Sequence, residues 1–134
     1  MIFQTATFYI EWEDSAVPWL KIFTNEPYKE LSLAPKEILD DLFRALLLIE
    51  REMIAYYKPA KINIASFGNY LPRLHFHIMA RFEEDSHFPE SMWGRKQREG
   101  GLKLPDKAYF EKRLIGALKS AFQDEPSAPA SPQK

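Results

Sequence analysis

The sequence predicts a single antiparallel α+β domain, and three observations lead to this fold class. Two short segments near the N-terminus and two in the middle of the chain alternate apolar and polar residues and are rich in aromatic and β-branched residues, which is typical of β-strands. Between the two pairs, one long segment repeats its apolar residues at the spacing of an α-helix. The length of 134 residues, 46% of them hydrophobic, suits one domain with its own core and is short for two.

The first pair of strands is predicted at Thr7–Glu13 and Trp19–Phe23. Asp14, Ser15 and Pro18 lie between them and are residues that favour turns. We therefore expect a β-hairpin close to the N-terminus.

The long helix is predicted over Pro35–Lys58. Pro35 lies near its first turn, where the missing amide hydrogen costs no intrahelical bond, and acidic residues follow it. Such an amphipathic helix needs a sheet to cover its apolar stripe. The stripe consists of Ile38, Leu39, Leu42, Leu46, Ile49, Met53 and Tyr57.

The second pair of strands is predicted at Lys61–Phe67 and Arg73–Phe82, joined by a turn that contains Gly, Asn and Pro. Helical spacing returns between Tyr109 and Phe122 and predicts a terminal helix. The segment 124–134 is rich in Pro, Ser and Ala and is expected to be disordered, which leaves a single domain at 1–123.

Composition limits the partners and the location that we expect. The chain has no Cys, so disulfides and thiolate metal sites are excluded, and its net charge of −1 gives no general attraction to nucleic acid. The longest apolar run, Ala45–Ile49, is far too short to span a bilayer, and the N-terminus does not resemble a secretion signal. We expect a cytoplasmic protein without a membrane or nucleic-acid partner.

Two of the three histidines lie one residue apart in the last predicted strand. Side chains alternate faces along a strand, and residues two apart lie about 6.6 Å from each other, close enough to converge on one anion such as phosphate. One face is continuously apolar and should cover the helix, so the other should line a cleft or meet solvent. The apolar face holds Leu74, Phe76, Ile78 and Ala80, and the opposite face holds Arg73, His75, His77 and Met79.

Two other interpretations of this pair remain open on the residues alone. The histidines are often simply half-buried strand residues in such a pattern. They also resemble part of a zinc site that would be completed by His87 or a nearby carboxylate, although Arg73 on the same face would repel the ion. We therefore expect neither a metal nor another cofactor.

The run FGNYLPRLHFHIMAR at Phe67–Arg81 resembles the histidine-triad (HIT) family of nucleotide hydrolases and transferases, whose motif alternates three histidines with hydrophobic residues. The resemblance covers roughly Phe8–Gly94 and includes the order of the elements and a trailing Trp93-Gly94. It is strongest to a bacterial branch in which the first triad position is not histidine. The resemblance implies a HIT-like fold, with an antiparallel sheet of about five strands, one long helix packed on it and a C-terminal helix.

The resemblance also implies roles for individual residues. His75 takes the place of the family's nucleophile, His77 that of a histidine that contacts phosphate, and Arg73 that of the first triad histidine. Further positions implied in substrate binding are Gly68 and Asn69 at the turn, Asn63 on the preceding strand, and Glu11 or Glu13, one of which would hold the ribose hydroxyls.

The expected function is attack by His75 on the α-phosphate of a nucleoside phosphate derivative, such as a dinucleoside polyphosphate or a phosphoramidate. Neutral imidazole is available for attack at neutral pH, and a backbone carbonyl can hold the proton on its other nitrogen. Arginine cannot donate and recover a proton near neutral pH, so the alternative is a nucleotide-binding module that lost turnover through Arg73. Tyr70 on the turn either substitutes near the leaving group or simply packs.

A homodimer is expected as well. The family pairs its sheets across a two-fold axis, and the chain has many aromatic residues for one small core. Those considered for a dimer surface are Trp12, Trp19, Phe43, Tyr56 and Tyr57.

Overall fold

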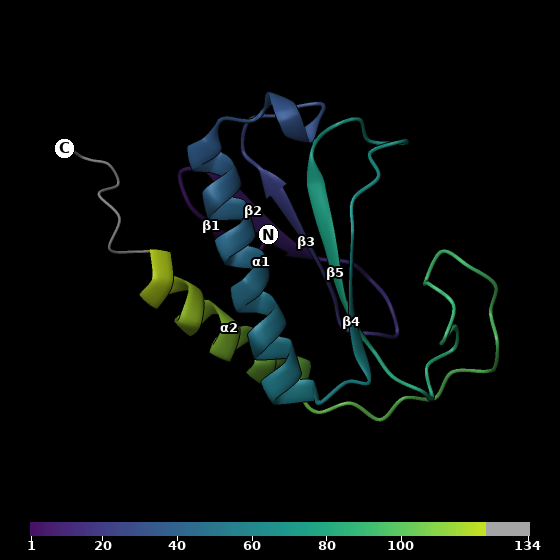
Figure 1. Ribbon diagram of the computed structural model, residues 1–134. Helices are drawn as coiled ribbons and strands as arrows, with labels where there is room; N and C mark the ends of the chain where they lie inside the picture. Colours follow the sequence, from purple (N-terminus) through teal and green to yellow (C-terminus); the bar gives the residue numbers. More distant parts are fainter. Residues whose placement is uncertain (123–134) are drawn as a thin grey trace.

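A five-stranded antiparallel sheet carries one long helix across one of its faces (Figure 1). The computed structural model describes residues 1–122, so the tail predicted at 124–134 lies outside the described residues. The elements are β1 (Phe3–Gln4), β2 (Phe8–Trp12), β3 (Trp19–Thr24), a short 3₁₀ helix η1 (Leu31–Leu33), α1 (Lys36–Tyr57), β4 (Lys61–Ala65), β5 (His75–Arg81) and α2 (Lys107–Phe122).

The strand order is β1-β2-β3-β5-β4, so β5 lies in the interior of the sheet and β4 at one edge. The predicted hairpin is confirmed, because β2 and β3 pair in antiparallel register with Ile10 opposite Ile22. On its other side, β3 pairs with β5 and places Lys21 opposite His77. β1 is a two-residue addition to the sheet that the sequence analysis did not predict separately.

The long helix α1 forms where the apolar spacing predicted it. Its stripe faces the sheet and forms the main core with the inward-facing residues of β2, β3 and β5. Lys58 ends the helix in the left-handed conformation with φ of 50°, and its amide donates to the Ile54 carbonyl at 3.1 Å. The buried residues of α1 are Leu42, Ala45, Leu46, Ile49, Met53 and Tyr57, all of them in the predicted stripe except Ala45.

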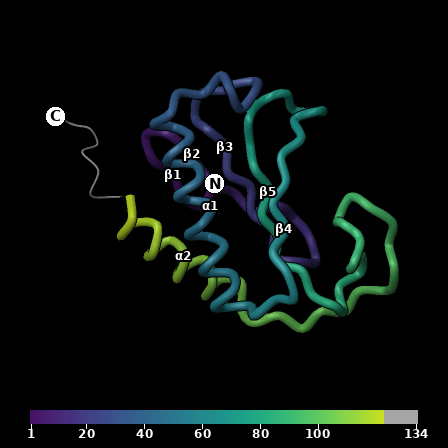
Figure 2. Tube along the Cα trace, viewed as in Figure 1, coloured from purple at the N-terminus to yellow at the C-terminus, as the bar shows by residue number. Residues whose placement is uncertain are grey.

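The terminal helix α2 packs beside α1, as Figure 2 shows, and buries Phe110, Leu114, Leu118 and Phe122 in the same core. No helix in the described part of the chain is both long enough and apolar enough to cross a lipid bilayer.

The last strand is shorter than predicted at its N-terminal end. We expected it to begin at Arg73, but the sheet pairing begins at His75. Pro72 precedes this point, and the Leu74 amide donates to the Tyr28 carbonyl at 2.6 Å instead of to a sheet partner. The assignment of faces is confirmed, since Leu74, Ile78 and Ala80 belong to the core under α1.

The aromatic residues considered for a dimer surface are mostly used inside the subunit. Trp19 and Tyr57 are buried, and Trp12 and Tyr56 are half-buried against the helices. Of the five, Phe43 alone is exposed, so the aromatic content by itself does not indicate an interface.

The face of the sheet opposite α1 is covered in part by the long segment between β5 and α2, which makes a wide excursion beside the sheet (Figure 2). Met79 lies there in a small second core with Val17 and Trp19. The segment is fixed by Asp85, which is 1% exposed and accepts hydrogen bonds from the amides of residues 82, 87 and 88.

Arg81 at the end of β5 makes a two-pronged ion pair with Asp85. Its Nε lies 2.9 Å from one carboxylate oxygen and its Nη2 lies 3.0 Å from the other. The remaining donors reach the Asn63 side-chain oxygen at 2.8 Å and the Glu90 carbonyl at 2.7 Å. Although burial raises the pKa of Asp85, the bonds from Arg81 and from the three amides outweigh it and hold that pKa well below its ordinary value.

Asp85→Asn tests this ion pair, because it removes the counter-charge of Arg81 and nearly preserves the shape of the side chain. We expect the free energy of unfolding to fall by about 3–5 kcal/mol, since a buried guanidinium is left without an opposite charge. The matched control is Glu84→Gln, an exposed carboxylate one residue away, which should stay within about 0.5 kcal/mol. Urea unfolding at neutral pH measures both variants.

The same pair predicts the pH dependence of stability. The pKa of Asp85 is lower in the folded chain than its ordinary 3.8, so its contribution is complete above that value and is lost as pH falls through the folded pKa. The stability difference between the parent protein and Asp85→Asn should therefore shrink on strong acidification. Equal unfolding midpoints for Asp85→Asn and Glu84→Gln at neutral pH would contradict the assignment.

Candidate functional site

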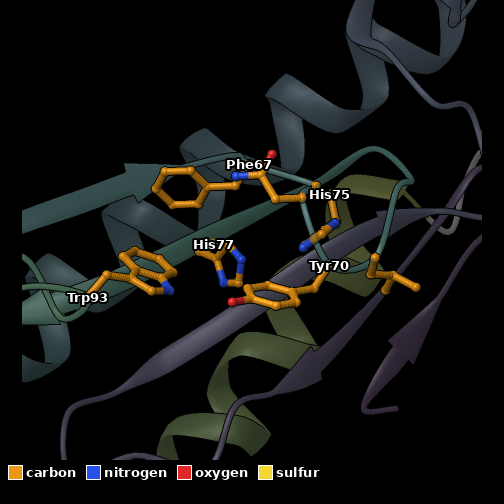
Figure 3. Close-up of a pocket in the computed structure, with 8 residues that line it drawn as sticks. Phe67, Tyr70, His75, His77 and Trp93 are labelled. Atoms are coloured by element: carbon orange, nitrogen blue, oxygen red, sulfur yellow. The ribbon is translucent and has the colours of Figure 1, made fainter.

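A cavity of about 400 Å³ opens on the sheet face opposite α1, where β4 ends and β5 begins. The two histidines on the floor come from β5, the turn between β4 and β5 forms one wall, and the segment after β5 supplies Trp93 (Figure 3). The lining residues are Phe67, Gly68, Asn69, Tyr70, Leu71, His75, His77 and Trp93.

The imidazole of His75 is fixed by a backbone carbonyl. Its Nδ1 lies 2.8 Å from the Arg73 carbonyl oxygen, and because a carbonyl only accepts, the proton of the neutral ring is on Nδ1. The ring stacks on Phe23 with centroids 4.8 Å apart and planes 17° apart. His75 therefore presents the unprotonated Nε2, with its lone pair, on the cavity side (Figure 3).

His77 has the opposite tautomer. The indole N–H of Trp19 donates to His77 Nδ1 at 3.0 Å, so Nδ1 is the acceptor and Nε2 carries the proton of the neutral ring. Burial lowers the pKa of His77 to about 4, and the neighbouring His75 and Lys21 act in the same direction. His77 is thus an uncharged N–H donor at neutral pH, next to the lone pair of His75 at a ring distance of 5.0 Å.

Trp93 forms the far wall of the cavity through a set of edge-to-face ring contacts. Its centroid lies 4.9 Å from Phe67, 5.0 Å from His77 and 5.1 Å from Trp19. Tyr70 is fully exposed, and its ring extends over the opposite side of the cavity (Figure 3). The walls are therefore aromatic, which suits a planar apolar group beside the histidines.

Arg73 does not line the cavity. Its Nη2 donates to the Thr24 carbonyl at the end of β3 and reaches the Asn25 carbonyl at 3.4 Å. Its Cζ lies 5.6 Å from the ring centroid of Phe23 and 6.0 Å from that of Tyr9. None of the lining residues, all within the described residues 1–122, is a lysine or an arginine.

Glu11 and Glu13 lie on the same face of the sheet but two strands away from the histidines. Lys21 pairs with both, at 3.5 Å from Glu11 and 2.9 Å from Glu13. Although burial lowers the pKa of Lys21, the two carboxylates raise it above its ordinary value. Because Lys21 is also the cross-strand neighbour of His77, this charged group borders the site without lining the cavity.

The remaining predicted residues divide into two groups. Gly68 has a φ of 80°, a conformation that favours glycine, and it lines the cavity together with Asn69. Asn63 accepts from Arg81 and lies outside the lining, and His87 makes a 2.7 Å hydrogen bond with the Ser86 hydroxyl. Within residues 1–122, no three histidine or carboxylate side chains gather as a metal site.

Sequence reasoning missed the role of Trp19 as the donor that sets the tautomer of His77. Trp19 is paired with Met79, two positions along the strands from the pair of Lys21 and His77 and on the same face of the sheet. The register between β3 and β5 decides this contact, and no local signal in the sequence specifies that register.

Comparison with known proteins places the chain in context. Residues 6–84 match the model of the HIT domain family. Among solved structures, a histidine triad protein from Bradyrhizobium japonicum is 26% identical, with a TM-score of 0.69 and coverage of 89% of this chain and 87% of that one. No curated protein is significantly similar in sequence.

Two more distant structures bear on the fold alone. A histidine triad protein from Sinorhizobium meliloti is 23% identical, with a TM-score of 0.70 and 87% of each chain covered. One from Marinobacter aquaeolei is 18% identical, with a TM-score of 0.68, 93% of this chain covered and 89% of that one. The predicted HIT-like fold is confirmed.

The state of His77 is testable by NMR on protein labelled with ¹⁵N in histidine. We expect the neutral tautomer with the proton on Nε2 to persist from neutral pH down to about pH 5, because the pKa is lowered to about 4. Trp19→Phe removes the donor to Nδ1 and should raise the pKa of His77, since the protonated ring no longer opposes an indole N–H. Protonation of His77 in the parent protein near its ordinary pKa of 6.5 would contradict this geometry.

Proposed function

The chain belongs to the HIT domain family, and on that premise we propose that it is a nucleotide phosphohydrolase or nucleotidyl transferase acting through His75. The observation that carries the proposal is the hydrogen bond from His75 Nδ1 to the Arg73 carbonyl, which leaves Nε2 unprotonated on the cavity side. The substrate is a nucleoside phosphate derivative that is attacked at its α-phosphate.

In the first step, the Nε2 lone pair of His75 forms a bond to the α-phosphorus, and the bond from phosphorus to the leaving group breaks with its electron pair. The imidazole then bears a nucleotidyl group on Nε2 and a proton on Nδ1, and it is positively charged. The Arg73 carbonyl stabilises this charge because it accepts the Nδ1 proton in a hydrogen bond at 2.8 Å. In the second step, water attacks phosphorus and loses a proton to the Tyr70 oxygen or to solvent, whichever protonated the leaving group. The N–P bond breaks with its electron pair returning to Nε2, which restores neutral His75.

Charge on the nonbridging oxygens is stabilised by uncharged donors. His77 donates its Nε2–H, because the Trp19 indole N–H is bonded to Nδ1. The turn residues Gly68 and Asn69 line the same cavity. The proton that the leaving group requires comes from the Tyr70 hydroxyl or from water, because Arg73 is engaged with two backbone carbonyls. Arg73 takes the first triad position in this proposal.

The nucleoside part fits the remaining features of the site. The aromatic walls of Phe67, Tyr70 and Trp93 accept a planar group, so a nucleotide is favoured over inorganic phosphate. Glu11 and Glu13 are acceptors on the same face of the sheet, and one of them holds the ribose hydroxyls. These hydroxyls compete with Lys21, which pairs with both carboxylates. Dinucleoside polyphosphates and phosphoramidates are both included in the proposed substrate class.

The chain is also proposed to form a homodimer through the β4 edge. β4 has a sheet partner on one side only, and Ile64 on this strand is 44% exposed. Phe43 and Leu47 are exposed on α1, and Phe43 contacts Phe76 of the neighbouring strand β5. A second copy that pairs along β4 would cover this apolar surface and the open backbone edge together.

Sedimentation at micromolar concentration tests the dimer, with Ile64→Lys as the disrupting variant. We expect a dimer for the parent protein and a monomer for Ile64→Lys, since a charge in a strand interface opposes edge pairing. Leu33→Lys, at an exposed leucine in η1, is the matched control and should remain dimeric. A monomeric parent protein would contradict the proposal.

His75→Asn tests the nucleophile, because asparagine keeps a polar side chain of similar size but cannot form the covalent intermediate. We expect nucleotide binding within a few-fold of the parent protein and hydrolysis slower by on the order of a thousandfold, about 4 kcal/mol in the barrier. His77→Gln should cost less, since it weakens charge stabilisation and leaves the attacking atom in place. The control is His87→Asn, which changes a histidine outside the cavity.

Trapping during turnover distinguishes an enzyme from a binding module. Brief incubation with labelled nucleotide substrate, followed by mass spectrometry, should give an acid-labile nucleotidyl adduct on the peptide that contains His75. The adduct should persist in His87→Asn and disappear in His75→Asn. Binding without turnover or adduct would favour the module that lost activity through Arg73, and an adduct on another residue would refute the assignment of His75.

A further inference from the structure

We propose that the aromatic walls of the cavity hold the leaving group of the substrate, and that this group is uncharged, apolar and planar. The substrate class narrows to a nucleoside monophosphate joined to such a group, for example through a phosphoramidate bond, and excludes polyphosphate leaving groups. The inference rests on the proposed function, because only a reaction defines a leaving group. Binding of an uncharged planar group between the walls is measured without turnover, so the two can fail separately.

The position of the leaving group follows from the direction of attack. The Nε2 atom of His75 faces the cavity from its floor, because Nδ1 is bonded to the Arg73 carbonyl. In phosphoryl transfer, the attacking and leaving atoms lie roughly in line on opposite sides of phosphorus. The leaving group therefore points away from the floor, into the space that Phe67, Tyr70 and Trp93 surround (Figure 3).

The nucleoside extends in a different direction. The proposed ribose acceptors are Glu11 on β2 and Glu13 directly after it, and the strand order places β2 two strands from β5 on the side away from β4. Phe67 follows β4 by two residues and thus lies on the other side of β5. The planar group that the walls accept is therefore the leaving group, and the nucleobase lies beyond the ribose.

Positive charge is scarce around the cavity, which argues against a polyphosphate. Lys21 lies 2.9 Å from Glu13 and 3.5 Å from Glu11, so these three side chains together are negative. His77 is neutral, and the Arg73 guanidinium donates to carbonyls at the end of β3, outside the cavity. Several phosphate charges between aromatic walls would lose their hydration without gaining a cation.

The basic residues that follow Trp93 do not alter this balance. Lys96 pairs with Glu99 at 3.0 Å, and Arg98 donates to a backbone carbonyl. Arg95 is exposed, and none of these three cations lines the cavity.

Trp93 is the wall residue that we assign as specificity-determining for the leaving group. Its indole meets Phe67, His77 and Trp19 edge to face, with centroids between 4.9 and 5.1 Å away. These contacts fix the ring, yet 47% of the residue remains exposed. A ring that is already fixed loses little entropy when a planar group packs on it, so it favours such a group over a small one.

Cleavage of a phosphoramidate of this class requires no further charged group. When His75 attacks, the bond from phosphorus to the amine nitrogen breaks, and the nitrogen keeps the electron pair. The nitrogen takes a proton from the Tyr70 hydroxyl or from water and leaves as a neutral amine. The apolar walls thus hold an uncharged group both before and after the step.

Binding is measured by calorimetry in the His75→Asn background, in which no turnover occurs. The probes are adenosine monophosphate, its benzylamine and methylamine phosphoramidates, and diadenosine triphosphate. We expect the benzylamine compound to bind at least about tenfold more tightly than the methylamine compound, which lacks a ring to stack. It should also bind at least about tenfold more tightly than diadenosine triphosphate, whose charges find no cation in the cavity.

Trp93→Ala in the same background tests the wall. It should weaken binding of the benzylamine compound about tenfold and that of the methylamine compound less than about threefold, and Trp93→Phe should recover part of the loss. Comparison of the two compounds cancels any effect of Trp93 on His77, because both compounds share the phosphate. The matched control is Tyr109→Ala, an exposed aromatic residue on α2 outside the cavity, which should change neither affinity.

Leu71→Lys tests the charge of the cavity, because it adds an ammonium group at a lining residue that is half exposed. We expect diadenosine triphosphate to bind at least about fivefold more tightly than in the background protein, and the benzylamine compound to bind less tightly. Leu33→Lys, at an exposed leucine outside the cavity, should leave both affinities within about twofold.

Three results would overturn the proposal. The first is equal affinity for the benzylamine and methylamine compounds, and the second is binding of diadenosine triphosphate as tight as that of the benzylamine compound. The third is a loss in Trp93→Ala that is as large for adenosine monophosphate as for the benzylamine compound, since it would place the nucleobase against Trp93. If Trp93→Ala does not fold, Leu71→Lys decides, and an unchanged ratio of the two affinities there overturns the proposal.

Turnover by the parent protein separates this inference from the proposed function. A parent protein that shows these affinities but cleaves none of the compounds would refute the enzyme and leave the site for a planar group in place. A parent protein that cleaves diadenosine triphosphate and the methylamine compound with the same kcat/KM as the benzylamine compound would support the enzyme and overturn this inference.

Discussion

The ion pair between Arg81 and Asp85 joins the strand that carries the histidines to the segment that closes their cavity. Side chains alternate along β5, so Arg81 lies on the same face as His75 and His77, beyond Met79. Both charged groups are 1% exposed, and such burial costs several kcal/mol per ion unless every donor and acceptor is satisfied. Here the pair is satisfied by Asn63, by the Glu90 carbonyl and by three backbone amides.

The anchored segment then brings Trp93 against Phe67 and His77 and completes the aromatic wall. The strand β5 thus determines two parts of the site. Its first residues carry the histidines of the floor, and Arg81 at its other end holds the segment that supplies Trp93 to the far wall. The site also relies on uncharged groups. His77 is kept neutral by burial and by its neighbours, and Lys21 is held by two carboxylates beside the cavity. In the proposed reaction, a lone pair and N–H donors therefore replace the positive charges usually associated with phosphate binding.

The elements and their faces were predictable because they follow from local periodicity. The spacing of apolar residues in α1 and the alternation of side chains in β5 identify which residues face the core. The same alternation places His75 and His77 on one face of the strand. The long-range contacts were not predictable. Trp19 sets the tautomer of His77, and this contact depends on the register of β3 against β5. Arg81 pairs with Asp85, which lies in a segment without a regular sequence pattern. Arg73 was assigned to the strand face that lines a cleft or meets solvent. Pro72 and the bond from Leu74 to Tyr28 end the strand pairing before it, and its side chain donates to the carbonyls of Thr24 and Asn25.

The position of Arg73 separates two contributions that one residue makes to the site. Its carbonyl accepts the Nδ1 proton of His75, and any amino acid at this position has that carbonyl. Its side chain is therefore free to differ, provided that the peptide unit stays in place. The guanidinium of Arg73 donates to the carbonyls of Thr24 and Asn25 at the end of β3 and packs on Phe23, outside the cavity. In the proposed reaction, a replaced triad position is thus compatible with turnover, because the step that needs residue 73 uses its backbone carbonyl, and the Leu74 amide of the same peptide unit is held by the Tyr28 carbonyl.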